Sequence, residues 1–162
     1  MSALPKLVAV LGPTACGKSG LGVALARRFD GEVVSADSRQ VYRGLDLGTG
    51  KITPEEMEGV PHHMLDVADP GEMYSVADFQ AGAYAAIDGI LSRGRVPFLV
   101  GGTGLYLRSV TEGFVFSDAQ PDPALREKLE ALSTLELRAL VEEKTGAVLS
   151  GVAQGLQPLW GQ

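Results

Sequence analysis

The feature that most constrains the fold is a phosphate-binding loop pattern near the amino terminus. Residues 12–19 read GPTACGKS and fit the pattern GxxxxGK followed by Ser or Thr. An apolar run, Leu7–Leu11, precedes the loop, and apolar residues recur at helical spacing after it at Leu21, Ala24, Leu25 and Phe29. The pattern therefore predicts a buried strand, the loop and a helix in succession. An ordinary glycine-rich turn is the alternative, and both flanking segments argue against it.

A loop of this kind binds phosphate mainly through backbone N–H groups and the positive end of the following helix. Lys18 would place a compact positive charge on the outer phosphate of a di- or triphosphate, and the Ser19 hydroxyl would ligate Mg²⁺. We therefore expect a phosphate site made by the eight residues Gly12, Pro13, Thr14, Ala15, Cys16, Gly17, Lys18 and Ser19.

Strands alternate with helices along the first two thirds of the chain. Two further strands are predicted at Glu32–Ala36 and Val96–Val100, and a long amphipathic helix begins at Ser75. Thr53–Glu56 has the capping-box spacing of a short helix. The alternation predicts an α/β fold of the P-loop NTPase type, a parallel sheet with flanking helices.

The last third of the chain has a different pattern. Asp122–Pro123 and Ser133–Glu136 each open a predicted helix, with no strand pattern between them. We therefore expect an incomplete α/β core at residues 1–115, the start of a helical insertion at 116–150 and an irregular tail at 151–162.

Charge and composition restrict the class of protein. The net charge is −6, yet residues 1–51 hold seven basic and four acidic side chains, so positive charge gathers around the phosphate loop. A single cysteine excludes an internal disulfide, and no apolar stretch is long enough to cross a membrane. We expect a cytoplasmic monomer with no membrane contact.

Asp37 is the candidate general base. It ends the second predicted strand and is followed by Ser38, Arg39 and Gln40. Ligand sites of parallel sheets lie at this edge, and a carboxylate there can accept a proton from an attacking group. The alternative is that Asp37 caps the next turn.

The third predicted strand runs into the turn Gly101–Gly104, which offers backbone N–H groups and the Thr103 hydroxyl. No acidic residue ends this strand, so either Asp37 also orients the metal or substrate oxygens hold it. A plain tight turn is the alternative for Gly101–Gly104. His62 and His63 lack further ligands for a zinc set, and we interpret both as structural.

Five segments together resemble the tRNA dimethylallyltransferase family, also called the tRNA isopentenyltransferase or IPP transferase family. They are GPTACGKS (12–19), SADSRQVYRGLDLGTGK (35–51), PHHMLDV (61–67), YSVADF (74–79) and VGGTGLYLRSVTEG (100–113). The resemblance covers about residues 7–132, and the pairing of ADSRQVY with GGTGLY is far more specific than the phosphate loop.

The resemblance implies an enzyme that transfers a dimethylallyl group from dimethylallyl diphosphate to the exocyclic amine of the adenosine next to the tRNA anticodon, releasing diphosphate. It implies that Thr14–Ser19 line the diphosphate site, with Mg²⁺ as cofactor. It places Lys18, Asp37 and Thr103 in catalysis, and tRNA contacts at Asp37, Ser38, Arg39, Gln40, Thr103 and Arg126. The target base would leave its stack in the anticodon loop.

Members of the family are roughly twice as long, and the resemblance fades after Leu132. It therefore implies that this chain is a fragment with weak or no transferase activity. The residues leave two alternative functions open. One is a small-molecule or nucleotide kinase that binds ATP or another nucleotide at the loop. The other is a non-catalytic remnant that binds phosphate.

Overall fold

A computed structural model of the chain describes residues 7–116 and 122–146. The chain divides into two compact units, Met1–Phe116 and Ser117–Gln162, and each is described here by itself. The expected tail at 151–162 lies outside the described residues. The three-part division expected from the sequence stays a prediction.

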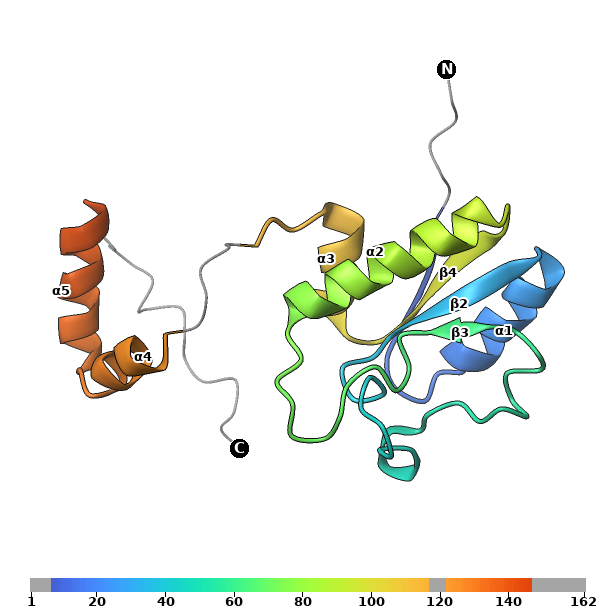
Figure 1. Cartoon of the computed structure of the whole chain (residues 1–162), viewed down its shortest axis with the longest axis horizontal. Helices are drawn as coiled ribbons and strands as arrows, with labels where there is room; N and C mark the ends of the chain where they lie inside the picture. The colour runs from blue at the N-terminus through green and yellow to red at the C-terminus, as the bar shows by residue number, and fades with distance from the viewer. Residues whose placement is uncertain (1–6, 117–121, 147–162) are drawn as a thin grey trace, which may run out of the picture. The chain divides into compact units, whose positions relative to one another are not determined.

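The first unit is built on a four-stranded parallel sheet, as the alternation of strands and helices predicts (Figure 1). The strands are β1 (Val8–Leu11), β2 (Gly31–Ala36), β3 (His62–His63) and β4 (Val96–Gly101), in the order β1-β4-β2-β3. The three long strands match the predicted ones, whereas β3 was not predicted. Parallel pairing brings the carboxyl ends of all strands to one edge, where the phosphate loop follows β1.

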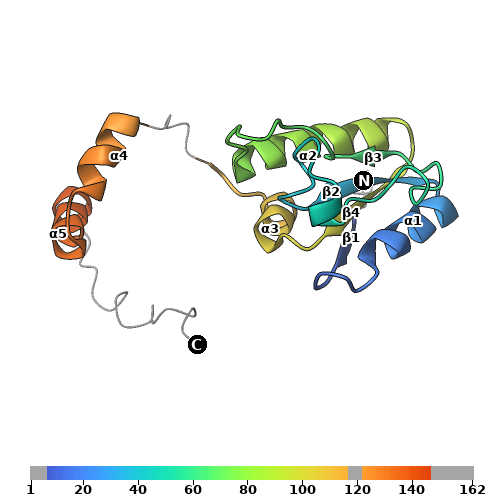
Figure 2. The same cartoon turned by 90° about the horizontal axis from the view of Figure 1, so that it is seen from below.

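Helices cover both faces of the sheet, because side chains of successive strand residues point to opposite faces. Val33 of β2 packs with Val23 and Ala26 of α1 (Lys18–Arg28). The next residue, Val34, packs on the other face against α2 (Val76–Ser92) and α3 (Gly104–Glu112). Figure 2 shows α1 on one side of the sheet and α2 on the other.

Gly101 allows β4 to approach β2 closely at the edge that carries the phosphate loop. A Cβ atom there would lie 2.2 Å from the carbonyl oxygen of Ala36, which no real side chain could tolerate. Glycine at the end of β4 therefore keeps the turns after β2 and β4 side by side.

A buried ion cluster holds the opposite end of the sheet. Glu32 is 2% exposed, and its carboxylate accepts hydrogen bonds from Arg93 at 2.7 and 3.1 Å and from Arg95 at 3.1 Å. His63 Nε2 lies 2.6 Å from the same carboxylate. The hydrogen bond from Arg93, helped by His63 and Arg95, outweighs burial and lowers the pKa of Glu32 to about 2. The cluster thus joins β2, β3 and the turn between α2 and β4.

The prediction of a short helix at Thr53–Glu56 is wrong, because this segment forms turns. The capping-box bonds form, with Thr53 N donating to Glu56 Oε2 at 2.9 Å and Glu56 N to Thr53 Oγ1 at 3.3 Å. The segment is nevertheless a series of turns, because Glu58 and Gly59 have φ of 48° and 79° and end the helical path. Glu56 and Glu58 of this stretch line a cavity.

The second unit contains two helices, α4 (Pro123–Glu130) and α5 (Thr134–Thr145), at the predicted starts. Asp122 caps α4 by accepting a hydrogen bond from Leu125 N, and Ser133 forms a capping box with Glu136 at the start of α5. Leu125 and Leu135 are 50% and 78% exposed. None of the described residues of these two helices is buried.

Candidate functional site

The phosphate loop has the backbone geometry of an anion-binding concavity. Ala15 and Gly17 have positive φ angles of 61° and 84°, and such left-handed residues turn successive N–H groups toward one side. The Lys18 ammonium folds over the loop, donating to the carbonyl oxygen of Pro13 at 2.5 Å and lying 3.8 Å from Cys16 Sγ. Backbone donors and one cation therefore converge on the same small volume.

Two helices begin at this edge of the sheet without a side-chain cap. Within the described residues, no side chain caps α1 at Gly17 or α3 at Thr103, whereas α2, α4 and α5 are all capped by side chains. The first N–H groups of a helix need partners and favour a negative charge. Both uncapped ends therefore suit an anionic ligand.

The turn that follows β4 lies against the phosphate loop. A Cβ atom on Gly102 would lie 3.4 Å from the carbonyl oxygen of Gly12 and 3.9 Å from Lys18 Nζ. Thr103 Oγ1 accepts a hydrogen bond from Ser38 N at 3.0 Å and lies 3.4 Å from Ser38 Oγ. The turn therefore connects the loop after β1 to the polar cluster after β2.

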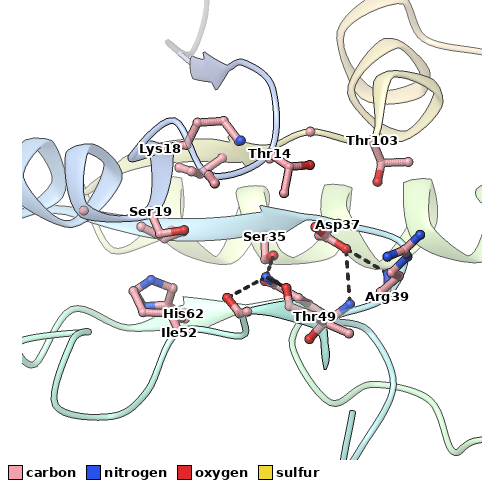
Figure 3. Close-up of a pocket in the computed structure, with 18 of the residues that line it drawn as sticks. Thr14, Lys18, Ser19, Ser35, Asp37, Arg39, Thr49, Ile52, His62 and Thr103 are labelled. Atoms are coloured by element: carbon pink, nitrogen blue, oxygen red, sulfur yellow. Dashed lines mark hydrogen bonds between the residues drawn. The ribbon is translucent and has the colours of Figure 1, made fainter. Parts of the chain in front are cut away.

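Asp37 both shapes its own turn and lines the cavity. Its Oδ1 accepts hydrogen bonds from Arg39 N at 2.9 Å and Gln40 N at 3.4 Å, as the capping alternative predicts. The carboxylate also borders the cavity that contains Lys18 and Thr103 (Figure 3). The two interpretations of Asp37 are compatible, since the capping bonds hold the carboxylate in place.

Gln40 holds one wall of the cavity. Its amide Nε2 donates to the carbonyl oxygens of Thr49 and Gly50, each at 3.3 Å, and its Oε1 accepts from Ser35 Oγ at 3.2 Å. Thr49 ends the short 3₁₀ turn η1 (Leu47–Thr49). Both ends of the Gln40 amide are therefore engaged with the protein, although the sequence led us to expect a tRNA contact.

The cavity between these segments has a volume of about 870 Å³. This lies within the range of about 300–1,000 Å³ that is typical of small-molecule sites. Of the residues expected in the site, those that line it are Thr14, Ala15, Gly17, Lys18, Ser19, Asp37, Ser38, Arg39, Gln40 and Thr103. In the described part of the chain, the lining does not include Gly12, Pro13 or Cys16, and Arg126 lies on α4 in the other unit.

The sequence did not predict one wall of the cavity. It is formed by Gly48, Thr49, Gly50, Ile52, Glu56, Glu58 and His62. The two adjacent histidines have different roles, because they point to opposite faces of β3: His63 bonds Glu32, and His62 borders the cavity (Figure 3). The contact of His62 Nδ1 with the carbonyl oxygen of Val60 at 2.9 Å fixes the proton there, and burial lowers the pKa of His62. A neutral ring then leaves Nε2 as a hydrogen-bond acceptor.

The donor atoms fit Mg²⁺ held largely by a substrate. Among residues 7–116 and 122–146, no group of three or more His, Cys, Asp or Glu side chains could hold a metal ion. Mg²⁺ commonly binds through one or two protein groups, water and phosphate oxygens, and so does not need such a group. The exposed Ser19 hydroxyl borders the cavity beside the phosphate loop and could provide one ligand.

Two family models match the sequence. The model described as "Isopentenyl transferase" matches residues 5–69, and the model described as "IPP transferase" matches residues 40–151. The second match alone covers more than half of the chain. The chain belongs to the IPP transferase family. The match extends to residue 151, beyond Leu132, where the sequence resemblance was expected to fade.

Curated relatives carry the name tRNA dimethylallyltransferase. The protein from Halalkalibacterium halodurans is 58% identical over 126 residues, which cover 78% of this chain and 40% of the relative. The protein from Salinispora tropica is 54% identical over 152 residues, which cover 94% of this chain and 47% of the relative. The chain therefore spans somewhat less than half the length of these relatives.

Solved structures of the family share the fold. The tRNA isopentenylpyrophosphate transferase from Bacillus halodurans is 51% identical with a TM-score of 0.69, over 87% of this chain and 48% of that one. A eukaryotic dimethylallyltransferase described as acting on tRNA is 34% identical with a TM-score of 0.74, over 85% of this chain and 35% of that one. The predicted fold class is confirmed.

No helix in residues 7–116 or 122–146 combines the length and apolar character needed to cross a membrane.

Proposed function

We propose that this chain carries the donor site and the proton-accepting group of a tRNA dimethylallyltransferase. The reaction moves a dimethylallyl group from dimethylallyl diphosphate to N6 of the adenosine next to the anticodon. The observation that carries the proposal is that one cavity joins an anion-binding loop around Lys18 to a carboxylate, Asp37, held in place by its own turn.

The diphosphate of the donor binds at the phosphate loop. The N–H groups near Ala15 and Gly17, together with the uncapped start of α1, meet the phosphate oxygens, and Lys18 adds a full positive charge. These groups also stabilise the charge that grows on the diphosphate as it leaves. Mg²⁺ bound through Ser19 and the phosphate oxygens would neutralise more of that charge.

The acceptor base lies on the Asp37 side of the cavity. As the adenine N6 forms its bond to C1 of the dimethylallyl group, the bond from C1 to the diphosphate oxygen breaks. The amine then loses a proton, and Asp37 accepts it. The hydrogen bond from Ser38 N to Thr103 Oγ1 links the turn after β4 to the segment that carries Asp37.

The nucleic acid meets the protein around the same edge. Ser38 and Arg39 border the cavity and can contact the extruded nucleotide, and Arg39 offers a cation for a phosphate. Gln40 acts through the wall formed by Thr49 and Gly50, because its amide is already bonded to that wall. Arg126 of α4 remains a proposed contact to RNA.

The chain by itself should transfer slowly or not at all. It covers 47% and 40% of the lengths of two relatives named tRNA dimethylallyltransferase, so the proposal concerns this segment acting alone. Donor binding depends on the phosphate loop and should persist, since that loop lies within residues 7–116.

The test compares two labelled ligands in the presence of tRNA. We expect labelled dimethylallyl diphosphate to bind the chain more tightly than labelled ATP, and no phosphate to be transferred from ATP. Tighter binding of ATP together with phosphoryl transfer would favour the kinase alternative. Rapid prenyl transfer with many turnovers would contradict the low activity proposed for this chain.

Two substitutions that each remove one positive charge test where the donor binds. Lys18→Ala should weaken donor binding by about tenfold or more, the value of a charge-assisted hydrogen bond. Arg28→Ala removes a positive charge from the last turn of the same helix and should leave donor binding unchanged. Equal losses for both variants would show that only the overall charge matters.

A further inference from the structure

Three branched apolar side chains form a floor in a cavity that is otherwise lined mainly by glycines and polar residues. They are Val33, Ile52 and Val100, which pack together in the core cluster on the α1 face of the sheet. Their exposed fractions are 3%, 9% and 6%, so each presents only a narrow strip to the cavity. This apolar floor is therefore small and is part of the folded core.

The apolar floor begins beside the phosphate loop. Val100 is paired with Ser35 in the sheet and directly precedes the Gly101–Gly102 turn, which lies against Lys18. Asp37 follows Ser35 by two residues, which is about 7 Å along an extended chain. A short hydrocarbon chain attached to a phosphate at the loop can thus lie on Val100 while its first carbon faces Asp37.

Ile52 lies at the other end of the floor, across the cavity from Lys18 (Figure 3). The residue before it, Lys51, has a side chain that is only 6% exposed. Its ammonium donates to one carbonyl oxygen and two carboxylates, those of Tyr42, Asp46 and Asp66, at 2.9, 2.7 and 2.6 Å. These three partners use all three N–H groups of the ammonium, so the backbone that carries Ile52 is held firmly.

Polar side chains border the floor beyond Ile52. The N–H of the next residue, Thr53, donates to Glu56 Oε2 at 2.9 Å, and Glu56, Glu58 and His62 all line the cavity. Covering a carboxyl group with hydrocarbon removes its water and is unfavourable. A chain that extends past Ile52 would therefore leave apolar contacts and meet acidic side chains.

We infer that Ile52 is a specificity-determining residue that restricts the donor to a single isoprene unit. The inference rests on the proposed function, from which it takes the diphosphate of the donor at the phosphate loop. The hydrocarbon group lies on the apolar floor, and Ile52 ends that floor. A second isoprene unit would reach the wall that carries Glu56 and Glu58.

The test compares the affinities of methyl, dimethylallyl and geranyl diphosphate by titration calorimetry. The unchanged chain should bind the dimethylallyl ester about tenfold more tightly than the methyl ester, because the floor covers part of its apolar area. It should bind the geranyl ester no more tightly than the dimethylallyl ester.

Ile52→Ala should reverse this preference. It should weaken binding of the dimethylallyl ester by about threefold, because apolar contact is lost, and strengthen binding of the geranyl ester, because the removed carbons leave room for a longer chain. Ile52→Val removes one carbon with less effect on folding and should shift both affinities in the same directions by less. The affinity for inorganic diphosphate should be the same in every folded variant.

Ile87→Ala is the matched control. Ile87 is 8% exposed, packs in the core cluster on the α2 face of the sheet and does not line the cavity. Its truncation should lower the free energy of unfolding, as that of Ile52 does, and leave the preference among the three esters unchanged. A shift in preference as large as that of Ile52→Ala would overturn the inference.

Two other results would also overturn it. One is a preference between the dimethylallyl and geranyl esters that Ile52→Ala and Ile52→Val both leave unchanged. The other is tighter binding of adenosine diphosphate than of dimethylallyl diphosphate, with Ile52→Ala weakening only the nucleotide, which would assign the floor to a nucleobase.

The same titrations separate this inference from the proposed function. If inorganic diphosphate binds while the methyl and dimethylallyl esters bind equally well, the inference about Ile52 fails and the phosphate site stands. If a folded chain binds none of the diphosphates, the proposed function fails and the inference fails with it.

Discussion

Replacing Glu32 by Gln removes the charge at the centre of the buried cluster and keeps the size of the side chain. The glutamine could still accept one hydrogen bond from Arg93, Arg95 or His63. What it loses is the attraction between the carboxylate and the two guanidinium groups. The cluster holds β3 through His63, so the substitution should also loosen the strand that carries His62 into the cavity.

The expected loss in the free energy of unfolding follows from the pKa of Glu32. Hydrogen bonding from Arg93, despite burial, lowers this pKa from 4.5 to about 2. A carboxyl group whose pKa is lower in the folded state than in the unfolded state stabilises the folded state. This contribution is fully present at pH values above the unfolded-state pKa, and it is lost as the pH falls through the folded-state pKa. The lowering of the pKa of Glu32 corresponds to a contribution of about 3 kcal/mol to the free energy of unfolding at pH values above 4.5.

Urea denaturation at two pH values is the assay. The free energy of unfolding of Glu32→Gln should be about 2–3 kcal/mol below that of the unchanged chain near pH 7, and the gap should shrink by about half near pH 3. Glu112→Gln is the control, because it breaks an exposed pair with Arg108 and should change little at either pH. A gap of equal size at both pH values would refute the electrostatic explanation.

Three further predictions concern the site. Gly101→Ala should destabilise the chain by about 1–3 kcal/mol in urea denaturation, because its Cβ would meet the carbonyl oxygen of Ala36, while Gly104→Ala has open space and should be tolerated. Saturating diphosphate should slow the alkylation of Cys16, an exposed thiol in the phosphate loop, by iodoacetamide; an unchanged rate would contradict diphosphate binding there. Where the unchanged chain shows measurable single-turnover transfer to tRNA, Asp37→Asn should lower the rate by about 100-fold without changing diphosphate affinity, and an unchanged measurable rate would remove Asp37 as the base.

Local patterns made the core of the fold predictable. The strand, loop and helix around Lys18 follow one another within a short segment, so periodicity and glycine placement were sufficient to predict them. The same holds for α2, whose capping box at Ser75 and Asp78 the structure contains. The edge where Asp37 and Thr103 meet also followed, because parallel strands end together.

Contacts between distant segments were not predictable from the sequence. A strand of two residues, His62–His63, has no periodicity to detect, and its place depends on Glu32, which lies 31 residues from His63. The wall formed by Thr49 and Gly50 depends on a side-chain amide, that of Gln40, rather than on any backbone pattern. The sequence therefore predicted the loop that follows β1 better than the segments that shape the rest of the cavity.

Binding of diphosphate at the loop around Lys18 can be measured by titration calorimetry with inorganic diphosphate. We expect saturable binding by the folded chain and a loss of about tenfold or more in affinity for Lys18→Ala, with the affinity of Arg28→Ala unchanged. Absence of heat from a sample shown to be folded, or equal binding by Lys18→Ala, would contradict the claim that this loop holds the diphosphate of a prenyl donor.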